Sequence, residues 1–159
     1  MQILWAPWRA KYVSGDCKEK GCLFCEKVKE KKDEENYILF RGKHCMVMLN
    51  AYPYNNGHLM IAPYRHIASL EELKKGEAQE MMDVLFEMVK VIKEVMHPEG
   101  FNIGMNLGRA GGAGIADHLH LHIVPRWVGD SNFMLTLSKT KVISEALSET
   151  YHKLKEKIK

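Results

Sequence analysis

The sequence predicts an α+β fold in which an antiparallel sheet packs against one long helix. Short apolar segments occur in runs before and after a single long amphipathic segment, instead of alternating with helices. That amphipathic segment, after Gly76, has apolar residues at every third or fourth position until His97-Pro98, as one face of a helix requires. The stretch from Asp117 to Arg126 alternates apolar residues with histidines, which is typical of a half-buried strand. We therefore expect about five strands, one long helix and a C-terminal helix.

The elements that precede the long helix begin with three short strands. Tyr37–Phe40 and Cys45–Leu49 are apolar runs joined by a turn at Gly42, and together they predict a hairpin. Asn55–Gly57 marks a further turn, and His58–Pro63 predicts a third strand that its proline ends.

Further elements lie on both sides of the long helix. Ser69 and Glu72 have the spacing of a capping box, which predicts a short helix before the long one. After the long helix, Phe101–Met105 predicts a fourth strand, and a glycine-rich loop, Gly108–Gly114, leads into the histidine strand. Ser144–Ile158 has the pattern of a final helix.

The chain has the length and organisation of one domain. Its 159 residues can bury a sizeable core, and no internal repeat or linker divides them. We expect a single domain over residues 1–159, with an N-terminal arm at 1–36, a catalytic core at 37–135 and the C-terminal helix at 136–159.

Composition narrows the class of protein. Hydrophobic residues make up 46% and charged residues 27%, as in ordinary globular proteins. The excess of 23 basic over 20 acidic residues gives a net charge of +3, too small to indicate a nucleic-acid partner. No segment approaches the roughly 20 apolar residues of a membrane span, and Met1–Val13 lacks the apolar run of a signal peptide. Four cysteines do not make a secreted disulfide framework in a chain of this size, so we expect a cytoplasmic protein.

Three histidines on one strand face are the main candidates for chemistry. His118, His120 and His122 point to one side of the predicted strand, because side chains alternate between faces. An imidazole can act as a nucleophile, a proton shuttle or a metal ligand near neutral pH. Neighbouring members of the row could share one ion, but the first and third lie about 13 Å apart on a straight strand. Two different tasks along the row are therefore favoured over one three-histidine metal site.

The loop before this strand is suited to binding an anion. From Asn106 to Gly114 it supplies an amide side chain and several glycines, whose backbone can form a nest of N–H groups. An anion cradle next to a row of imidazoles suggests phosphoryl chemistry. One imidazole would attack phosphorus while backbone donors stabilise the developing charge.

The same residues resemble a known family. His118–Val124 matches the His-φ-His-φ-His-φ-φ signature of the histidine-triad family of nucleotidyl hydrolases and transferases, where φ is an apolar residue. The similarity extends to Leu49-Asn50, to Gly57–Pro63 and to Pro125-Arg126-Trp127. The segments Leu4–Arg9 and Gly108–Phe133 resemble a bacterial and archaeal branch close to diadenosine tetraphosphate phosphorylases.

This resemblance implies a role for each matching residue. The catalytic histidines would be His118, His120 and His122, with His120 as the nucleophile. His122 would contact the phosphate and orient His120 through its own backbone carbonyl. Asn50 would bind the ribose, whereas His58 is either a polar neighbour of the active site or a participant in catalysis. The residues expected to hold phosphate oxygens are Asn106, Gly112, Ala113 and Gly114, together with His122.

The resemblance also implies the reaction and the assembly. A dinucleoside polyphosphate such as diadenosine tetraphosphate would be cleaved at its α-phosphate through a nucleotidyl-histidine, without an organic cofactor. Many relatives carry a glutamine shortly before the first histidine, where this chain has glycine and alanine, which leaves room for inorganic phosphate as the acceptor. The alternatives are a purine nucleoside phosphoramidase and a non-catalytic nucleotide-binding adaptor. Relatives of this kind usually form homodimers, so a homodimer that binds an adenosine-type nucleotide is expected.

A Cys-x-x-Cys pair lies in the N-terminal arm. Cys22 and Cys25 could be redox-active or half of a zinc site, but the βαβ setting of a thioredoxin-type motif is missing. In zinc-bearing relatives the other two ligands match His66 and His118, which implies a closed structural zinc site. Two reduced thiols in a loop remain the alternative, and Cys17 could replace either cysteine as a ligand.

The rest of the arm is less informative. Leu4–Arg9 is rich in aromatic residues, and we expect Trp5 and Trp8 to pack against the domain rather than stack on a base. The charged run Glu26–Glu35 predicts a polar helix.

Overall fold

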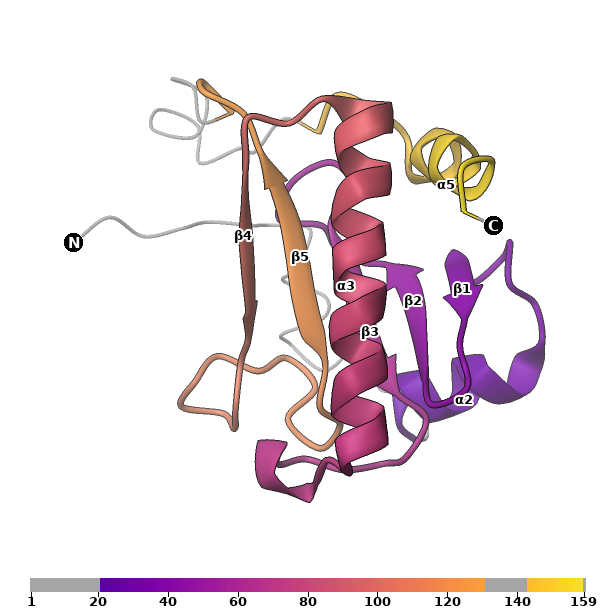
Figure 1. The fold of residues 1–159 in the computed structure, drawn as a ribbon, viewed down its shortest axis with the longest axis vertical. Coiled ribbons are helices and arrows are strands. Elements are labelled where there is room, and N and C mark those ends of the chain that lie inside the picture. Colours follow the sequence, from indigo (N-terminus) through magenta and orange to yellow (C-terminus); the bar gives the residue numbers. More distant parts are fainter. Residues whose placement is uncertain (1–20, 131–142, 159) are drawn as a thin grey trace.

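The fold is one antiparallel sheet with helices on both of its faces (Figure 1). The structure is a computed structural model that describes residues 21–130 and 143–158. The strands are β1 (Ile38–Arg41), β2 (Cys45–Leu49), β3 (Leu59–Pro63), β4 (Gly100–Met105) and β5 (Leu121–Arg126). The helices are α2 (Leu23–Glu30), the short 3-10 helix η2 (Leu70–Glu72), α3 (Lys75–Met96) and α5 (Leu147–Lys155).

Within the described residues the sheet has five strands in the order β1-β2-β3-β5-β4, and every neighbouring pair is antiparallel. The chain passes from β3 through α3 to β4 at the far edge and then returns as β5 into the space between β3 and β4. This order places β5, which follows the glycine-rich loop, in the interior of the sheet. An α+β fold with an antiparallel sheet, one long helix and a C-terminal helix is therefore confirmed.

Helix α3 covers one face of the sheet. Its apolar stripe, which includes Met81, Leu85 and Ile92, packs on side chains such as Ile61 and Ile123 of the central strands. Strands β2 and β3 are buried along their whole length, so each must also pack on the opposite face. That need explains why both are continuous apolar runs rather than alternating ones.

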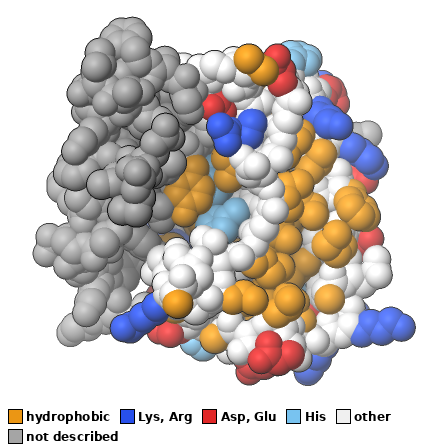
Figure 2. All heavy atoms as spheres, turned by 90° about the vertical axis from the view of Figure 1, so that its left-hand side faces the viewer, with side chains coloured by type: hydrophobic (Ala, Val, Ile, Leu, Met, Phe, Trp, Pro, Cys, Tyr) orange, Lys and Arg blue, Asp and Glu red, His pale blue; other side chains and the backbone are white. Residues whose placement is uncertain are grey.

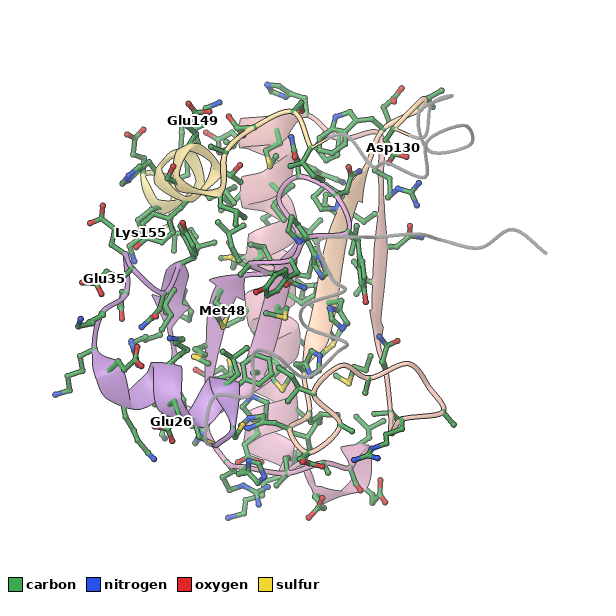
Figure 3. All side chains as sticks on the ribbon, turned by 180° about the vertical axis from the view of Figure 1, so that it is seen from behind. Glu26, Glu35, Met48, Asp130, Glu149 and Lys155 are labelled. Atoms are coloured by element: carbon green, nitrogen blue, oxygen red, sulfur yellow. The ribbon has the colours of Figure 1, made fainter. Side chains whose placement is uncertain are left out.

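The opposite face of the sheet carries the histidines and helix α2. Met48 pairs with Met60 across β2 and β3, and Met60 pairs with His122 across β3 and β5, so these three side chains share a face. Seen from behind in Figure 3, Met48 lies near the middle of this face while α2 crosses below it. Phe24 of α2 packs into the apolar cluster there.

Helix α5 lies beside the β1 edge. The Tyr151 hydroxyl donates to the carbonyl of Ile38 at 3.3 Å. The ammonium of Lys155, which Figure 3 labels, donates to the carbonyl of Leu39 at 2.7 Å. The C-terminal helix therefore satisfies acceptors at a strand edge that would otherwise be exposed.

Three predicted boundaries were wrong. Strand β5 begins at Leu121 instead of Asp117, because Pro63 of β3 has no N–H for a ladder and the Leu119 N–H donates to Ile67 at 2.6 Å. The polar helix spans Leu23–Glu30 instead of Glu26–Glu35, because Phe24 is buried at its start and Lys31 ends it with a φ of 52°.

The third difference is at the C-terminus, where the helix covers only Leu147–Lys155 of the predicted segment. The aromatic arm with Trp5 and Trp8, Cys17, and residues 131–142 lie outside the described residues. None of the helices within the described ranges is long and apolar enough to cross a membrane.

Candidate active site

A cavity of about 1020 Å³ opens on the sheet face that carries the histidines. Met48, Met60, His120 and His122 contribute to its lining from the sheet side. Residues 113–117, at the end of the glycine-rich loop and just after it, also line the cavity, and so does the start of α2. Figure 2 shows a histidine side chain in a depression on the side of the molecule where the sheet edge faces the viewer. This volume is large enough for a nucleotide-sized ligand.

His120 is held so that one ring nitrogen can act as a nucleophile. Its Nδ1 donates to the carbonyl of His118 at 2.8 Å, because a carbonyl oxygen can only accept. The ring proton of the neutral form is therefore on Nδ1, and Nε2 keeps its lone pair. Burial lowers the pKa of His120, which favours this neutral form. The expectation that the carbonyl of His122 orients this ring was wrong, since the carbonyl of the preceding histidine does so.

The hydrogen of His122 is assigned by a chain of hydrogen bonds that starts at Tyr54. The backbone N–H of Tyr54 donates to Nδ1 of His58 at 3.0 Å, so the proton of a neutral His58 must be on Nε2. That Nε2 lies 2.9 Å from Nδ1 of His122 and donates to it. The N–H of His122 is therefore on its own Nε2, as a hydrogen-bond donor.

The pair formed by His120 and His122 is suited to attack on phosphorus. Their ring centroids lie 4.7 Å apart at an interplanar angle of 74°. A nucleophilic nitrogen thus lies next to a donor that can stabilise charge on a phosphate oxygen. His58 is fully buried and contacts the rest of the site through His122, Tyr54 and Asn50.

The predicted phosphate-binding loop is only partly directed at the cavity. Ala113 and Gly114 line the cavity, whereas Asn106 and Gly112 are not among the described residues that do so. The N–H groups of Gly112 and Ala113 donate to loop carbonyls at 3.0 and 3.2 Å, so in this conformation they stabilise the loop itself. Arg109 lines the cavity and was not predicted, although it is the only cationic residue between Asn106 and Gly114.

Asn50, the predicted ribose ligand, lies in the cavity wall. Its Oδ1 accepts from the Tyr52 N–H at 2.9 Å, and its Nδ2 lies 3.4 Å from Nδ1 of His58. Tyr52 and Tyr54 also line the cavity and were missed, since nothing in the local pattern separates them from ordinary turn residues.

The predicted metal ligands converge from three parts of the chain. Cys22 and Cys25 come from the start of α2, His66 follows β3, and His118 precedes β5, yet their ligand atoms all lie within 4.8 Å of one another. The Sγ–Nδ1 distances are 3.2 Å for Cys22 and His118, 3.5 Å for Cys25 and His66, and 3.6 Å for Cys25 and His118. Tetrahedral zinc with typical bond lengths would separate such ligands by about 3.6 Å.

The orientation of His118 also fits a metal ligand. Its Nε2 donates to the carbonyl of Pro63 at 2.8 Å, which leaves the Nδ1 lone pair directed at the two cysteines. The donor set therefore fits a closed structural zinc site. Cys45, by contrast, belongs to the core, and burial raises the pKa of its thiol to about 12.

Comparison with known proteins agrees with this geometry. Residues 31–128 match the HIT domain. Over 158 residues the chain is 40% identical to the AP-4-A phosphorylase of Mycobacterium tuberculosis, an alignment that covers 94% of this chain and 80% of that protein. The chain belongs to the HIT family. The resemblance noted in the sequence is thereby confirmed.

Solved structures of histidine triad proteins have the same fold as this HIT chain. A Zn-bound histidine triad family protein from Mycobacterium smegmatis has a TM-score of 0.70 at 23% identity, covering 86% of this chain and 91% of that one. A hypothetical histidine triad nucleotide-binding protein from Sulfolobus tokodaii has a TM-score of 0.66 at 27% identity, covering 85% of this chain and 87% of that one.

Proposed function

We propose that this HIT chain cleaves dinucleoside polyphosphates such as diadenosine tetraphosphate at the α-phosphate through a nucleotidyl-His120 intermediate. The observation that carries the proposal is that two neighbouring rings at the cavity offer complementary groups. Nε2 of His120 has a lone pair, and Nε2 of His122 has a hydrogen to donate. The relative named AP-4-A phosphorylase supports the substrate class.

In the first step, Nε2 of His120 attacks the α-phosphorus. A P–N bond forms as the P–O bond to the remaining polyphosphate breaks, and the electron pair leaves with that polyphosphate. The imidazole becomes cationic, and the carbonyl of His118 stabilises it through the Nδ1–H bond. His122 donates its Nε2–H to a phosphate oxygen on which negative charge increases.

In the second step, an acceptor oxygen attacks the same phosphorus. The P–N bond breaks and its electron pair returns to Nε2 of His120. Inorganic phosphate as the acceptor gives a nucleoside diphosphate, whereas water gives a nucleoside monophosphate and releases a proton. Arg109 supplies a cation at the cavity that suits either an anionic acceptor or the polyphosphate.

The test compares the wild type with His120→Ala on diadenosine tetraphosphate, with and without inorganic phosphate. We expect the variant to lose at least about a thousandfold in turnover, because the covalent route is removed. In the wild type, ADP formed only with phosphate identifies a phosphorylase, and cleavage without phosphate identifies a hydrolase. Preference for an adenosine phosphoramidate supports the phosphoramidase, and tight binding without turnover supports the adaptor. Unchanged turnover in His120→Ala contradicts the proposal.

We also propose that Cys22, Cys25, His66 and His118 bind a structural zinc ion. When bound, the metal would cross-link α2 to the segment after β3, through His66, and to the segment before β5, through His118. The proposed chemistry at phosphorus does not need the metal. The convergent ligand atoms and the Zn-bound relative of the same fold support the site. Thiolate ligands are consistent with a reducing cytoplasm, where we place the protein.

Metal analysis tests the zinc site. The wild type purified from zinc-replete medium should contain about one zinc per chain, and Cys22→Ser should lose most of it, because one of the thiolate ligands is removed. Cys45→Ser, which alters a buried core cysteine, is the matched control and should keep the metal. A wild type without zinc under these conditions contradicts the site.

We propose a homodimer that forms through the β4 edge and the outer face of α3. Large apolar side chains are exposed on both elements: Met82 and Phe86 on α3 are 41% and 56% exposed, and Ile103 on β4 is 46% exposed. Figure 2 shows the corresponding hydrophobic patch on this side of the molecule. Contiguous exposed apolar surface beside a strand edge that no other described strand pairs with is typical of a protein interface.

A further inference from the structure

Phe24 is the one residue of α2 that is fully buried, and its ring contacts the rings of His120 and His118. Its ring centroid lies 5.1 Å from that of His120, at an interplanar angle of 42°. The distance to the His118 ring is 5.0 Å, at 50°. Leu23, the residue before it, lines the cavity, whereas Phe24 is not among the described residues that do. Phe24 therefore supports the histidines without facing the substrate.

The other contacts of His120 do not by themselves fix the plane of its ring. The hydrogen bond to the carbonyl of His118 holds Nδ1 at 2.8 Å. His122 presents its ring at 74° with centroids 4.7 Å apart. The torsion between an imidazole and its Cβ has a broad energy profile, so packing of neighbouring side chains against the ring is needed to fix its orientation. Phe24 supplies such a contact.

The position of Phe24 in the sequence adds to the argument. It lies between Cys22 and Cys25, whose sulfur atoms reach the ring nitrogens of His66 and His118. Helix α2 is otherwise mostly polar, and Phe24 anchors the end that carries it in the apolar cluster. The arrangement holds one aromatic ring against the nucleophile.

We propose that Phe24 is a positioning residue for His120, which keeps Nε2 aligned for in-line attack on the α-phosphorus. This inference rests on the proposed function. A misalignment of the nucleophile lowers the rate of the covalent step and leaves substrate binding nearly unchanged. If Phe24 only filled space in the apolar cluster, its replacement would instead lower the free energy of unfolding without a specific effect on the covalent step.

The experiment compares Phe24→Leu with Val28→Ala. Val28 is on the same helix and packs on the same apolar cluster, so its variant is a control for loosened packing. The covalent step is measured by rapid-quench labelling with radioactive diadenosine tetraphosphate, and bound zinc and the free energy of unfolding are measured in parallel. We expect Phe24→Leu to slow labelling about ten- to a hundredfold. We also expect its KM to stay within about twofold and its zinc content to match the wild type. Val28→Ala should label at the wild-type rate.

A second measurement does not depend on activity. Nitrogen NMR of the histidine rings reports which nitrogen carries the proton, and we expect one Nδ1–H form of His120 in the wild type and in Val28→Ala. In Phe24→Leu, His120 should show a mixture of the two tautomers, because the His120 ring can then leave the His118 carbonyl. If Phe24→Leu does not fold, Phe24→Met replaces it, since methionine fills a similar volume without a flat ring.

The outcomes separate the two proposals. Wild-type labelling or tautomer populations in Phe24→Leu overturn the positioning role, and so does an equal loss of labelling in Val28→Ala. If the wild type itself forms no labelled histidine, the proposed function fails, while the NMR comparison still decides the role of Phe24.

Discussion

His58 controls the hydrogen-bonding state of its neighbour His122. It is fully buried behind the cavity, whereas His122 lines it. Because the Tyr54 N–H donates to its Nδ1, the Nε2–H of His58 donates to His122 and fixes the tautomer there. Without that donor, His122 could place its proton on Nδ1 and would then face a phosphate oxygen with a lone pair.

Replacing His58 should therefore lower the catalytic rate. We expect His58→Leu to reduce kcat about ten- to a hundredfold with little change in KM, because a partner that orients an active group is lost. His58→Gln, whose amide N–H can occupy the place of Nε2, is the matched variant and should retain more activity. Steady-state kinetics on diadenosine tetraphosphate measure both. A wild-type kcat in His58→Leu would show that the tautomer of His122 does not depend on this residue.

The identity of the site could be read from the sequence better than its internal arrangement. Strict alternation placed His120 and His122 on one face, and the structure brings both to the cavity. The two residues that hold them are distant in the sequence. His58 lies 64 positions before its partner His122, and Phe24 lies 96 positions before its partner His120. Those contacts depend on strand order and on the packing of α2, which no local pattern specifies.

Among the connections between elements, the ion pair of Arg65 and Glu77 joins the segment after β3 to the start of α3. The guanidinium donates twice, to Oε1 at 2.6 Å and to Oε2 at 2.7 Å. The hydrogen bonds from Arg65 lower the pKa of Glu77 to about 2 from 4.5, although partial burial opposes the shift. Arg65 immediately precedes the proposed zinc ligand His66, so this pair also fixes that part of the chain.

The pair should stabilise the fold in a pH-dependent way. Since the pKa of Glu77 is lower in the folded than in the unfolded state, its contribution is complete above about pH 4.5. It is lost as the pH falls toward about 2. We expect Glu77→Gln to lower the free energy of unfolding at pH 7 by about 2 kcal/mol, the size of a charged hydrogen bond.

Urea unfolding at several pH values measures this effect. The difference between Glu77→Gln and the wild type should shrink steadily below pH 4.5. Glu87→Gln, which removes an exposed pair with Lys90, should change stability little at any pH. A difference for Glu77→Gln that stays constant down to pH 2 would rule out the ion pair as its origin.

Element boundaries show where local patterns reach their limit. The strands β1 to β4 and helix α3 agree with the predictions within a few residues, because apolar runs, proline and helical periodicity mark them. Helix α2 was misplaced because its one fully buried residue, Phe24, carries no periodic signal. The start of β5 was misplaced because the hydrogen-bond partner of Leu119 comes from the connection after β3.

For the molecule as a whole, the apolar patch on α3 and β4 predicts how two chains assemble. Phe86→Glu places a charge in the proposed interface, so we expect it to convert a dimer into a monomer. Leu70→Lys, which alters an exposed apolar residue on η2, is the control and should remain dimeric. Sedimentation equilibrium at several concentrations gives the masses. A wild type that is monomeric at all of them contradicts the interface.

The C-terminal helix has a consequence for how far such a sheet can grow. Tyr151 and Lys155 occupy backbone acceptors along β1, so a further strand cannot add there without displacing α5. Among the described strands, only the β4 edge then remains for growth of the sheet, and a two-fold pairing through β4 would use it. Two chains would then complete the particle, and open-ended polymerisation into fibres would be blocked by a single short helix.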